Sequence, residues 1–437
     1  MRLKISVHAG RRQSIVLHPQ TAAHFNIPNH KEVKLKFGQQ SMKLITTLSE
    51  QQHPQEISIS REALHRLGIP LFNQYELKVN GREIVIGPFL ALLLWTDVGI
   101  AARRLQQFTA HYEELGGALA AFNPTGTVSK SKRIRGIIYN PVEGRWTETK
   151  IPYAAAVFRR CTLPWDHKLF SFYGDKMINQ RGFDKWMLHK RIKSSPLAGR
   201  CFPETTLFRD KGDILELLQR HRSVYLKPID GASGRGIMKV SMDGNGLNVE
   251  WRQGISGSNS AKMDVPQFHS FLKRSLGTRK YIVQQGIHLL TYDERLVDFR
   301  LILAKDEHGQ WKDYGLIGKY GKKKSIVSNI SSGGIAEMGE LALKRILNLS
   351  DAQVGRKRES IAQIGIEVAK EIEKAFNVTY GDLAFDVGVD ERGDVWIIEV
   401  NILGDPTIAL DAGNRSLYEQ LIRANLMYAK RMSGFPV

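Results

Sequence analysis

Acidic side chains within residues 383–401 have the spacing of a metal site. Two apolar runs rich in β-branched residues flank a polar turn, a pattern typical of a β-hairpin. If the turn is centred on Arg392–Gly393, the numbers of paired residues sum to 785, so that Asp386 faces Glu399. Asn401 then lies on the same face, because side chains along a strand alternate with period two.

Carboxylates that face one another across a hairpin repel, because their Cβ atoms lie about 4.5–5.5 Å apart. A shared hard cation removes that repulsion, and oxygens of Asp, Glu and Asn are ligands that Mg²⁺ accepts. The pattern therefore indicates Asp386, Glu399 and Asn401 as metal ligands. An ordinary hairpin with solvent-facing acids is the alternative that the pattern alone leaves open.

A glycine-rich loop lies between two predicted strands. Ser223–Pro228 predicts the first strand, Gly231–Gly236 the loop and Ile237–Val240 the second strand. A Walker or Rossmann loop leads into a helix, and that context is missing. A glycine loop between strands instead forms a flap whose backbone N–H groups close over phosphates. A simple glycine-rich turn is the alternative.

The flap and its first strand carry the side chains that phosphate binding needs. Gly234 and Gly236 permit a close approach of the backbone, and Ser233 adds a hydroxyl donor. Lys227, on the strand that enters the flap, can neutralise phosphate charge. Further along, Arg300 shares one face of a predicted strand with an aspartate and could grip a phosphoryl group through its planar fork. A structural Asp–Arg pair would give the same pattern.

Composition limits the classes of protein that remain. The chain has 437 residues, 42% of them hydrophobic and 24% charged, which predicts a globular protein of about three domains. Its longest apolar run, Phe89–Trp95, is far shorter than the roughly 20 residues of a membrane span. The first residues alternate like a strand and lack the apolar core of a secretory signal. Two cysteines indicate no disulfide framework, so we expect a cytoplasmic protein.

The net charge of +19 favours anionic partners such as nucleotides, acidic peptides or nucleic acid. The basic clusters are scattered and accompany no nucleic-acid-binding motif, which makes nucleic acid a weaker expectation than solvated basic surface. The thirteen histidines show no metal-ligand spacing.

The elements that must position these residues begin with an internal repeat. The segments Ser14–Phe37 and Glu56–Val79 align without gaps at a constant offset of 42, and each predicts a strand, a short helix, an Ile-Pro turn and a strand. Two such units bury their apolar faces by interlocking into a small barrel, a pattern that resembles a double-psi barrel. We expect a barrel at 1–88, a mixed α/β subdomain at 89–180 and the chemistry at 181–437.

The ordered set of motifs resembles the ATP-grasp superfamily over about residues 181–437, and the whole chain resembles the YheC/YheD family of endospore coat-associated ATP-grasp proteins. The stretches that carry this resemblance are the N-terminal repeat, Ile86–Pro88, Cys201–Thr205, Leu226–Pro228 with its flap, and Ile398–Asn401. The implied fold is α/β (α+β), an ATP-grasp fold preceded by a mixed α/β subdomain and a double-psi-like β-barrel.

The resemblance also implies roles. Residues that match ATP-binding positions are Lys185, Lys227, Ser233, Gly234, Gly236, Gln284, Gln285, Ile287 and Asn329. Arg300 matches the arginine that faces the γ-phosphate and the acyl-phosphate, and Lys227 is expected to assist it. Asp386, Glu399 and Asn401 match the ligands of paired Mg²⁺ ions. The chain departs from the pattern at Lys319, where relatives often have Arg, and at Gln285, where many have Glu.

These roles imply a ligase that uses ATP and Mg²⁺ to join a carboxylate to an amine or thiol, with a peptide or a spore coat component as a candidate substrate. Because ATP-grasp ligases rely on positioning and charge neutralisation, little acid–base machinery is required. Two alternatives stay open: a spore coat scaffold that binds ATP without turnover, and a basic nucleic-acid-binding protein. ADP release that depends on a carboxylate would distinguish the ligase from the scaffold. A steep salt dependence of binding would identify the nucleic-acid-binding protein.

Overall fold

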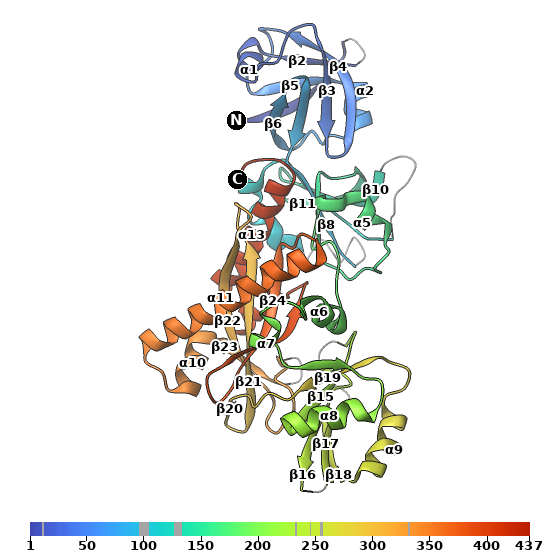
Figure 1. The fold of residues 1–437 in the computed structure, drawn as a ribbon. Helices are drawn as coiled ribbons and strands as arrows, with labels where there is room; N and C mark the ends of the chain where they lie inside the picture. The colour runs from blue at the N-terminus through green and yellow to red at the C-terminus, as the bar shows by residue number, and fades with distance from the viewer. Residues whose placement is uncertain are drawn as a thin grey trace.

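The computed structural model describes residues 1–437 except 11–12, 96–104, 126–132, 232–233, 245, 254–256 and 331–332. The molecule is elongated, with a β-barrel at one end, a mixed sheet in the middle and two further sheets at the other end (Figure 1). No helix in the described part of the chain is long and apolar enough to cross a membrane.

The barrel forms because each repeat offers one apolar face. Its seven strands close in the order β1-β5-β2-β4-β3-β7-β6. They are β1 (Arg2–His8), β2 (Ser14–Leu17), β3 (Glu32–Phe37), β4 (Gln40–Leu48), β5 (Glu56–Ser60), β6 (Gln74–Asn80) and β7 (Glu83–Gly87). Helices α1 (Pro19–His24) and α2 (Arg61–Leu67) occupy the equivalent positions of the two repeats, as predicted. The double-psi description of the strand crossings stays a prediction.

The middle sheet contains the apolar run that is too short for a membrane span. Its strand order is β11-β10-β9-β8-β12-β13. The strands are β8 (Phe89–Leu93), β9 (Ala118–Phe122), β10 (Arg133–Asn140), β11 (Arg145–Pro152), β12 (Ala156–Arg159) and β13 (Met177–Ile178), followed or flanked by α4 (Tyr112–Leu115), α5 (Lys168–Tyr173) and the 3₁₀ helix η1 (Gly174–Lys176). The residues before Gly116–Gly117 predict a single helix over Val98–Leu115. Part of that range lies outside the described residues, and the remainder is interrupted by a turn before α4.

The third sheet forms a lobe with its own apolar core, formed largely by the sheet with α8 and α9. Its strand order is β14-β19-β15-β16-β17-β18. The elements are β14 (Thr205–Leu207), α8 (Lys211–His221), β15 (Ser223–Pro228), β16 (Met238–Asp243), β17 (Gly246–Gln253), β18 (Gly257–Met263), α9 (Val265–Ser275) and β19 (Tyr281–Gln285). A strand, not a helix, follows the glycine loop, as the sequence predicts. We call this unit the small lobe.

The fourth sheet and its helices form the large lobe. Its strand order is β23-β22-β21-β24-β25, with β20 paired to β21. The strands are β20 (Thr291–Tyr292), β21 (Arg295–Lys305), β22 (Trp311–Tyr320), β23 (Ile335–Met338), β24 (Asp382–Val389) and β25 (Val395–Asn401). The helices are α6 (Lys185–Ile192), α7 (Ala198–Cys201), α10 (Gly339–Leu347), α11 (Asp351–Phe376), α12 (Ile408–Asp411) and α13 (Arg415–Met432).

Helix α11 shows why this lobe folds. Ser350 caps its first turn and Asn377 ends it in the left-handed conformation. Ile361 and Ile372 are fully buried on the apolar face of the helix, whereas Phe376 is only half-buried beside Phe183.

Helix α13 ties the large lobe to the rest of the molecule. Its apolar side chains pack against residues of the middle sheet in one core, and Lys430 donates to Glu76 of the barrel at 2.7 Å. Phe435, just beyond the helix, packs against Gly87, where a Cβ would lie 2.3 Å from the Phe435 ring. The chain end at 437 therefore lies beside the barrel (Figure 1).

Candidate functional site

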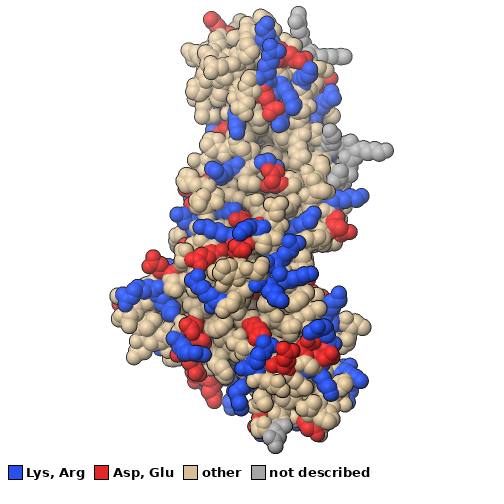
Figure 2. Space-filling view, viewed as in Figure 1, with Lys and Arg blue, Asp and Glu red and all other residues tan. Residues whose placement is uncertain are grey.

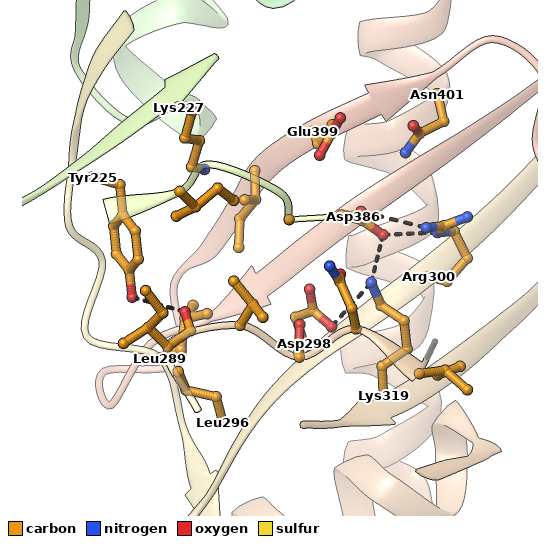
Figure 3. A pocket seen from close by; sticks show the side chains of 18 of the residues that line it. Tyr225, Lys227, Leu289, Leu296, Asp298, Arg300, Lys319, Asp386, Glu399 and Asn401 are labelled. Carbon is orange, nitrogen blue, oxygen red and sulfur yellow. Dashed lines mark hydrogen bonds and ion pairs between the residues drawn. The ribbon is translucent and has the colours of Figure 1, made fainter. Parts of the chain in front are cut away.

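The small and large lobes enclose a cavity of about 420 Å³ (Figure 3). One end is polar and is lined by Lys227 from the small lobe and by acidic and basic residues of β21, β22, β24 and β25. The other end is apolar. Its residues are Tyr225, Ile237, Ile287, Leu289, Leu296, Ile326, Val327, Ile330 and Ile398. A ligand with a flat apolar body and a multiply charged tail matches this division.

The acidic hairpin has the predicted register at the residues that matter. Asp386 pairs with Glu399, and Ala384 pairs with Asn401, so the three predicted ligand positions share one face. A β-bulge between Asp386 and Val387 shifts the pairs nearer the turn by one residue, to sums of 784. The turn centre inferred from the sequence was therefore wrong by half a residue, and the bulge restores the pairing of the acids.

A row of charged side chains runs across four strands of the large lobe, and paired residues have opposite charges except at Asp386 and Glu399. Lys319 of β22 pairs with Asp298 of β21, Arg300 of β21 pairs with Asp386 of β24, and Asp386 pairs with Glu399 of β25. Lys319 Nζ lies 2.7 Å from Asp386 Oδ1 and 3.2 Å from Asp298 Oδ1, and Arg300 Nε donates to Asp386 Oδ1 at 2.7 Å (Figure 3). We call Asp298, Arg300, Lys319 and Asp386 the charge network.

Burial and charge act in opposite directions on the pKa values of this network. Burial alone would raise the pKa of the Asp386 carboxyl, but Arg300 and Lys319 outweigh it and hold that pKa well below its ordinary value. Burial raises the pKa of the Asp298 carboxyl, against the effect of Lys319. Burial would lower the pKa of Lys319, but Asp298 and Asp386 raise it above its ordinary value. Asp386 therefore stays ionised and Lys319 stays protonated near neutral pH.

The two predicted lysines approach the site from different elements. Lys227 on β15 donates to Gln284 Oε1 at 2.6 Å, and Gln284 Nε2 donates to Thr205 Oγ1 at 3.1 Å. Burial lowers the pKa of Lys227 to about 8, against the attraction of Glu399. Lys185 opens α6 and donates to the Gly231 carbonyl at 2.7 Å, with Glu399 Oε1 3.0 Å from its Nζ.

The glycine loop approaches the large lobe across the cavity. Gly234 lines the cavity with φ +70°, and a Cβ there would lie 2.7 Å from Asn329 Nδ2. Only glycine therefore fits this approach without a shift of a neighbour. Tyr225 Oη donates to the Ile326 carbonyl at 3.4 Å, so the segment that precedes Asn329 also crosses between the lobes. Ser233 lies outside the described residues.

Most of the predicted site residues meet in the cavity. Those that line it are Lys227, Gly234, Gln284, Gln285, Ile287, Arg300, Asn329, Asp386, Glu399 and Asn401. Gly236 lies at the base of the glycine loop against Pro228, and Lys185 lines a neighbouring cavity instead. The Gln285 side chain accepts from the Glu204 N–H at 3.1 Å, so this amide holds the linker between the lobes.

Apart from Ile287, the residues of the apolar end of the cavity were missed because they look like ordinary core. Gly388 inside β24 was a usable signal, since glycine within a strand marks a close approach. A Cβ at Gly388 would lie 2.4 Å from Leu289 Cδ2 and 2.9 Å from Ile398 Cδ1, two residues that line the cavity.

The polar end offers hard oxygen donors. Asp386 and Glu399 supply carboxylates and Asn401 supplies an amide oxygen, a donor set that fits Mg²⁺. Within the described residues, no three His, Cys, Asp or Glu side chains cluster as a metal site, so the amide is needed to complete the set. Arg300 and Lys319, which donate to Asp386, keep the pKa of its carboxyl low and the carboxylate ionised.

Comparison with known proteins identifies relatives of this arrangement. The family described as YheC/D like ATP-grasp matches residues 174–432, more than half of the chain. The endospore coat-associated protein YheD of Bacillus subtilis (strain 168) is 23% identical over 370 residues, which cover 79% of this chain and 79% of that protein. YheC of the same organism, also named an endospore coat-associated protein, is 20% identical over 304 residues, covering 66% of this chain and 81% of that protein.

Solved structures with a similar fold include the ATP-grasp ligase PsnB complexed with a precursor variant, Mg and ADP, at 11% identity and a TM-score of 0.45 over 79% of this chain and 99% of that one. The D-alanine-D-alanine ligase from Coxiella burnetii is similar at 12% identity and a TM-score of 0.42, over 78% of this chain and 96% of that one.

Proposed function

The chain belongs to the YheC/D-like ATP-grasp family, and on that premise we propose that it is an ATP-dependent ligase that activates a carboxylate and joins it to an amine or thiol. The observation that carries the proposal is the cavity between the lobes, in which an apolar end adjoins a row of charges. The purine of ATP suits the apolar end and the triphosphate suits the polar end.

Basic residues of the chain are placed to stabilise the negative charge on the phosphoryl group during such a reaction. In the first step a carboxylate oxygen attacks the γ-phosphorus of ATP, the bond from that phosphorus to the β,γ-bridging oxygen breaks, and ADP leaves. Arg300, fixed by its bonds to Asp386, presents its remaining N–H groups to the transferring phosphoryl group. Lys227 adds a second positive charge from the small lobe.

In the second step the amine nitrogen or thiol sulfur attacks the carbonyl carbon of the acyl phosphate. The carbon–oxygen bond to phosphate breaks, inorganic phosphate leaves, and the nucleophile gives up its proton to phosphate or solvent. Asp386, Glu399 and Asn401 would hold Mg²⁺ against the triphosphate, where the metal supplies charge neutralisation worth several kcal/mol. One ion or two would be compatible with this donor set.

The test is ADP release from purified protein. The protein is incubated with ATP, Mg²⁺ and an extract of sporulating cells fractionated into carboxylates and amines, and new adducts are identified by mass. We expect ADP release that depends on a carboxylate, and a product whose mass is the sum of an acid and a nucleophile minus water. Absence of carboxylate-dependent ADP release from a protein that binds ATP would refute the ligase.

A coat scaffold that binds ATP without turnover is the second candidate, and one observation favours it. Asp386 is already neutralised by Arg300 and Lys319, so the charge network is satisfied without any metal. The names of the two Bacillus relatives agree with a role in the spore coat. Binding of ATP with no ADP release under any combination of substrates would support this candidate. For either candidate, we propose that the protein is made in the cytoplasm and becomes associated with the spore coat.

Nucleic-acid binding receives no support from the face of the molecule shown in Figure 2. On the face shown in Figure 2, Lys and Arg side chains are spread over the whole length of the molecule with Asp and Glu among them. An electrostatic footprint for a nucleic acid is a stripe or patch of one sign. The excess of positive charge is therefore better explained by solvated surface.

A further inference from the structure

Gln284 lies beside Lys227 at the polar end of the proposed ATP cavity. It is 8% exposed, and the strand pairing places it between Thr205 of β14 and Tyr225 of β15 on one face of the small-lobe sheet. Lys227 follows two residues along β15 and therefore shares that face. The family resemblance implies that Gln284 contacts ATP, but both ends of its side-chain amide are engaged within the protein.

The hydrogen bonds of this amide have only one possible direction. The Thr205 hydroxyl donates to the Pro203 carbonyl at 2.9 Å, and a carbonyl cannot donate in return. The Thr205 oxygen must therefore accept from Gln284 Nε2, which lies 3.1 Å away. This leaves Gln284 Oε1 to accept from Lys227 Nζ at 2.6 Å. The backbone at Pro203 thus determines which end of the amide meets the lysine.

The partner of Lys227 is neutral. Lys227 is 8% exposed, and among the described residues no carboxylate forms an ion pair with it, since Glu399 pairs with Lys185. The charged groups that face Lys227 from neighbouring elements are Glu399, Asp386, Asp298 and Lys185. An amide oxygen holds an ammonium group by a hydrogen bond and cancels none of its charge. A carboxylate in the same place would neutralise the ammonium before a phosphate arrived.

We propose that Gln284 is a positioning residue for Lys227: it holds the ammonium group in the cavity wall, in an orientation set by Thr205, and leaves its charge free for the triphosphate of ATP. This assignment rests on the proposed function, since it concerns a lysine that is expected to bind phosphate. Gln284 therefore acts through Lys227 and makes no contact with the base of the nucleotide.

The first test compares two probes that differ in the triphosphate, adenosine and a non-hydrolysable ATP analogue with Mg²⁺, each titrated into the full chain by calorimetry. Gln284→Met keeps the length of the side chain and removes the acceptor. It should weaken binding of the analogue about tenfold or more, through the loss of a hydrogen bond to a charged group, and leave binding of adenosine within about twofold. Equal weakening of both probes, or unchanged binding of the analogue, would overturn the proposal.

The pH profile tests whether Gln284 acts through Lys227. The pKa of Lys227 is about 8, so affinity for the ATP analogue should fall above that pH. Gln284→Glu places a carboxylate against the ammonium and raises the pKa of Lys227, which should move the onset of this fall upward by about 1–3 pH units. Binding at pH 7 should also weaken, because the carboxylate cancels the charge. An onset that stays near pH 8 would refute the assignment.

The small lobe offers a matched control for this substitution. Gln267→Glu makes the same change at an exposed position of α9, where either side chain can accept from the Asp264 N–H. Affinity for the analogue and the onset of its fall should both stay as in the wild type. An onset that moved equally in the two variants would contradict an action through Lys227.

A pair of substitutions at Thr205 tests the direction of the hydrogen bonds. Thr205→Ser keeps the hydroxyl that orients the amide, and Thr205→Val removes it at nearly constant volume. The serine variant should bind the analogue within about twofold of the wild type and the valine variant about fivefold more weakly, with adenosine binding retained as evidence of folding. Equal binding of the analogue by the two variants would remove the hydrogen-bond chain on which the proposal stands.

Failure of this assignment and failure of the ligase are distinguishable. A pH onset that Gln284→Glu moves, in a protein that releases no ADP with any carboxylate, keeps the assignment and refutes the ligase. Carboxylate-dependent ADP release, with an onset that Gln284→Glu leaves in place, keeps the ligase and refutes the assignment.

Discussion

Replacing Lys319 by methionine tests whether the charge network is as solvent-excluded as its geometry indicates. Lys319 is 2% exposed, and its Nζ lies within 3.2 Å of Asp298 and 2.7 Å of Asp386. Lys319→Met keeps the volume of the side chain but leaves two buried carboxylates with only Arg300 to compensate them. Removing one partner of a buried ion pair costs about 3–5 kcal/mol, so we expect the free energy of unfolding to fall by about that amount.

The chain offers a matched control for this substitution. Lys323 lies at the same 2.7 Å from Asp293, but about half of each side chain is exposed. Lys323→Met should therefore lower the free energy of unfolding by less than about 1 kcal/mol. Urea unfolding of both variants, followed by far-UV circular dichroism, gives the comparison.

A second substitution identifies the cause of the loss. Asp298→Asn in the Lys319→Met background neutralises one of the two stranded carboxylates and should restore roughly 1–3 kcal/mol. If Lys319→Met were as mild as Lys323→Met, the network would be hydrated and the reasoning about its pKa values would fail.

The remaining predictions concern the proposed ATP site. Glu399→Gln should abolish Mg²⁺-dependent ADP release and change the free energy of unfolding by less than about 1 kcal/mol, because only a half-buried charge is lost; unchanged ADP release would remove the metal assignment. The pKa of Lys227 is about 8, below the ordinary 10.5, so its ammonium is lost as pH rises through 8. Affinity for a non-hydrolysable ATP analogue should fall about tenfold per pH unit above 8, and Lys227→Gln should remove this slope; a slope that persists contradicts the role. Gly388→Ala should weaken binding of that analogue about tenfold by pushing Leu289 into the cavity, a typical overpacking effect. Gly199→Ala, where a Cβ meets nothing within 4 Å, is the control.

The sequence predicts the acidic hairpin well because two constraints act together there. Strand alternation and a short turn place Asp386 opposite Glu399, and the structure confirms this pairing. The bulge beside Asp386 has no residue signature, so the turn centre was wrong even though the important pair was right. The strands and short helices of the N-terminal repeat could also be predicted from the sequence, because its two copies show the same period-two pattern at one offset.

The sequence predicts contacts between distant segments poorly. Lys185 and Arg159 lie far apart in the chain from Glu399, and nothing local shows which cavity each residue lines. Leu289 and Ile398 carry no polar signal, since an apolar side chain at a ligand resembles one in the core. Lys319 was noticed only as a departure from the family pattern, whereas its two ion pairs depend on the alignment of β22 with β21 and β24.

Helix α13 has a consequence for the order in which the molecule can be assembled. The barrel belongs to the first ninety residues and leaves the ribosome early, but Glu76 meets Lys430 and Gly87 meets Phe435 only after synthesis has passed residue 435. Until then, a barrel that has already closed remains tethered to the nascent chain and lacks its contacts with α13. Its final orientation is thus fixed only after α13 has been made, and a release from the ribosome short of that point would leave a folded but unanchored barrel.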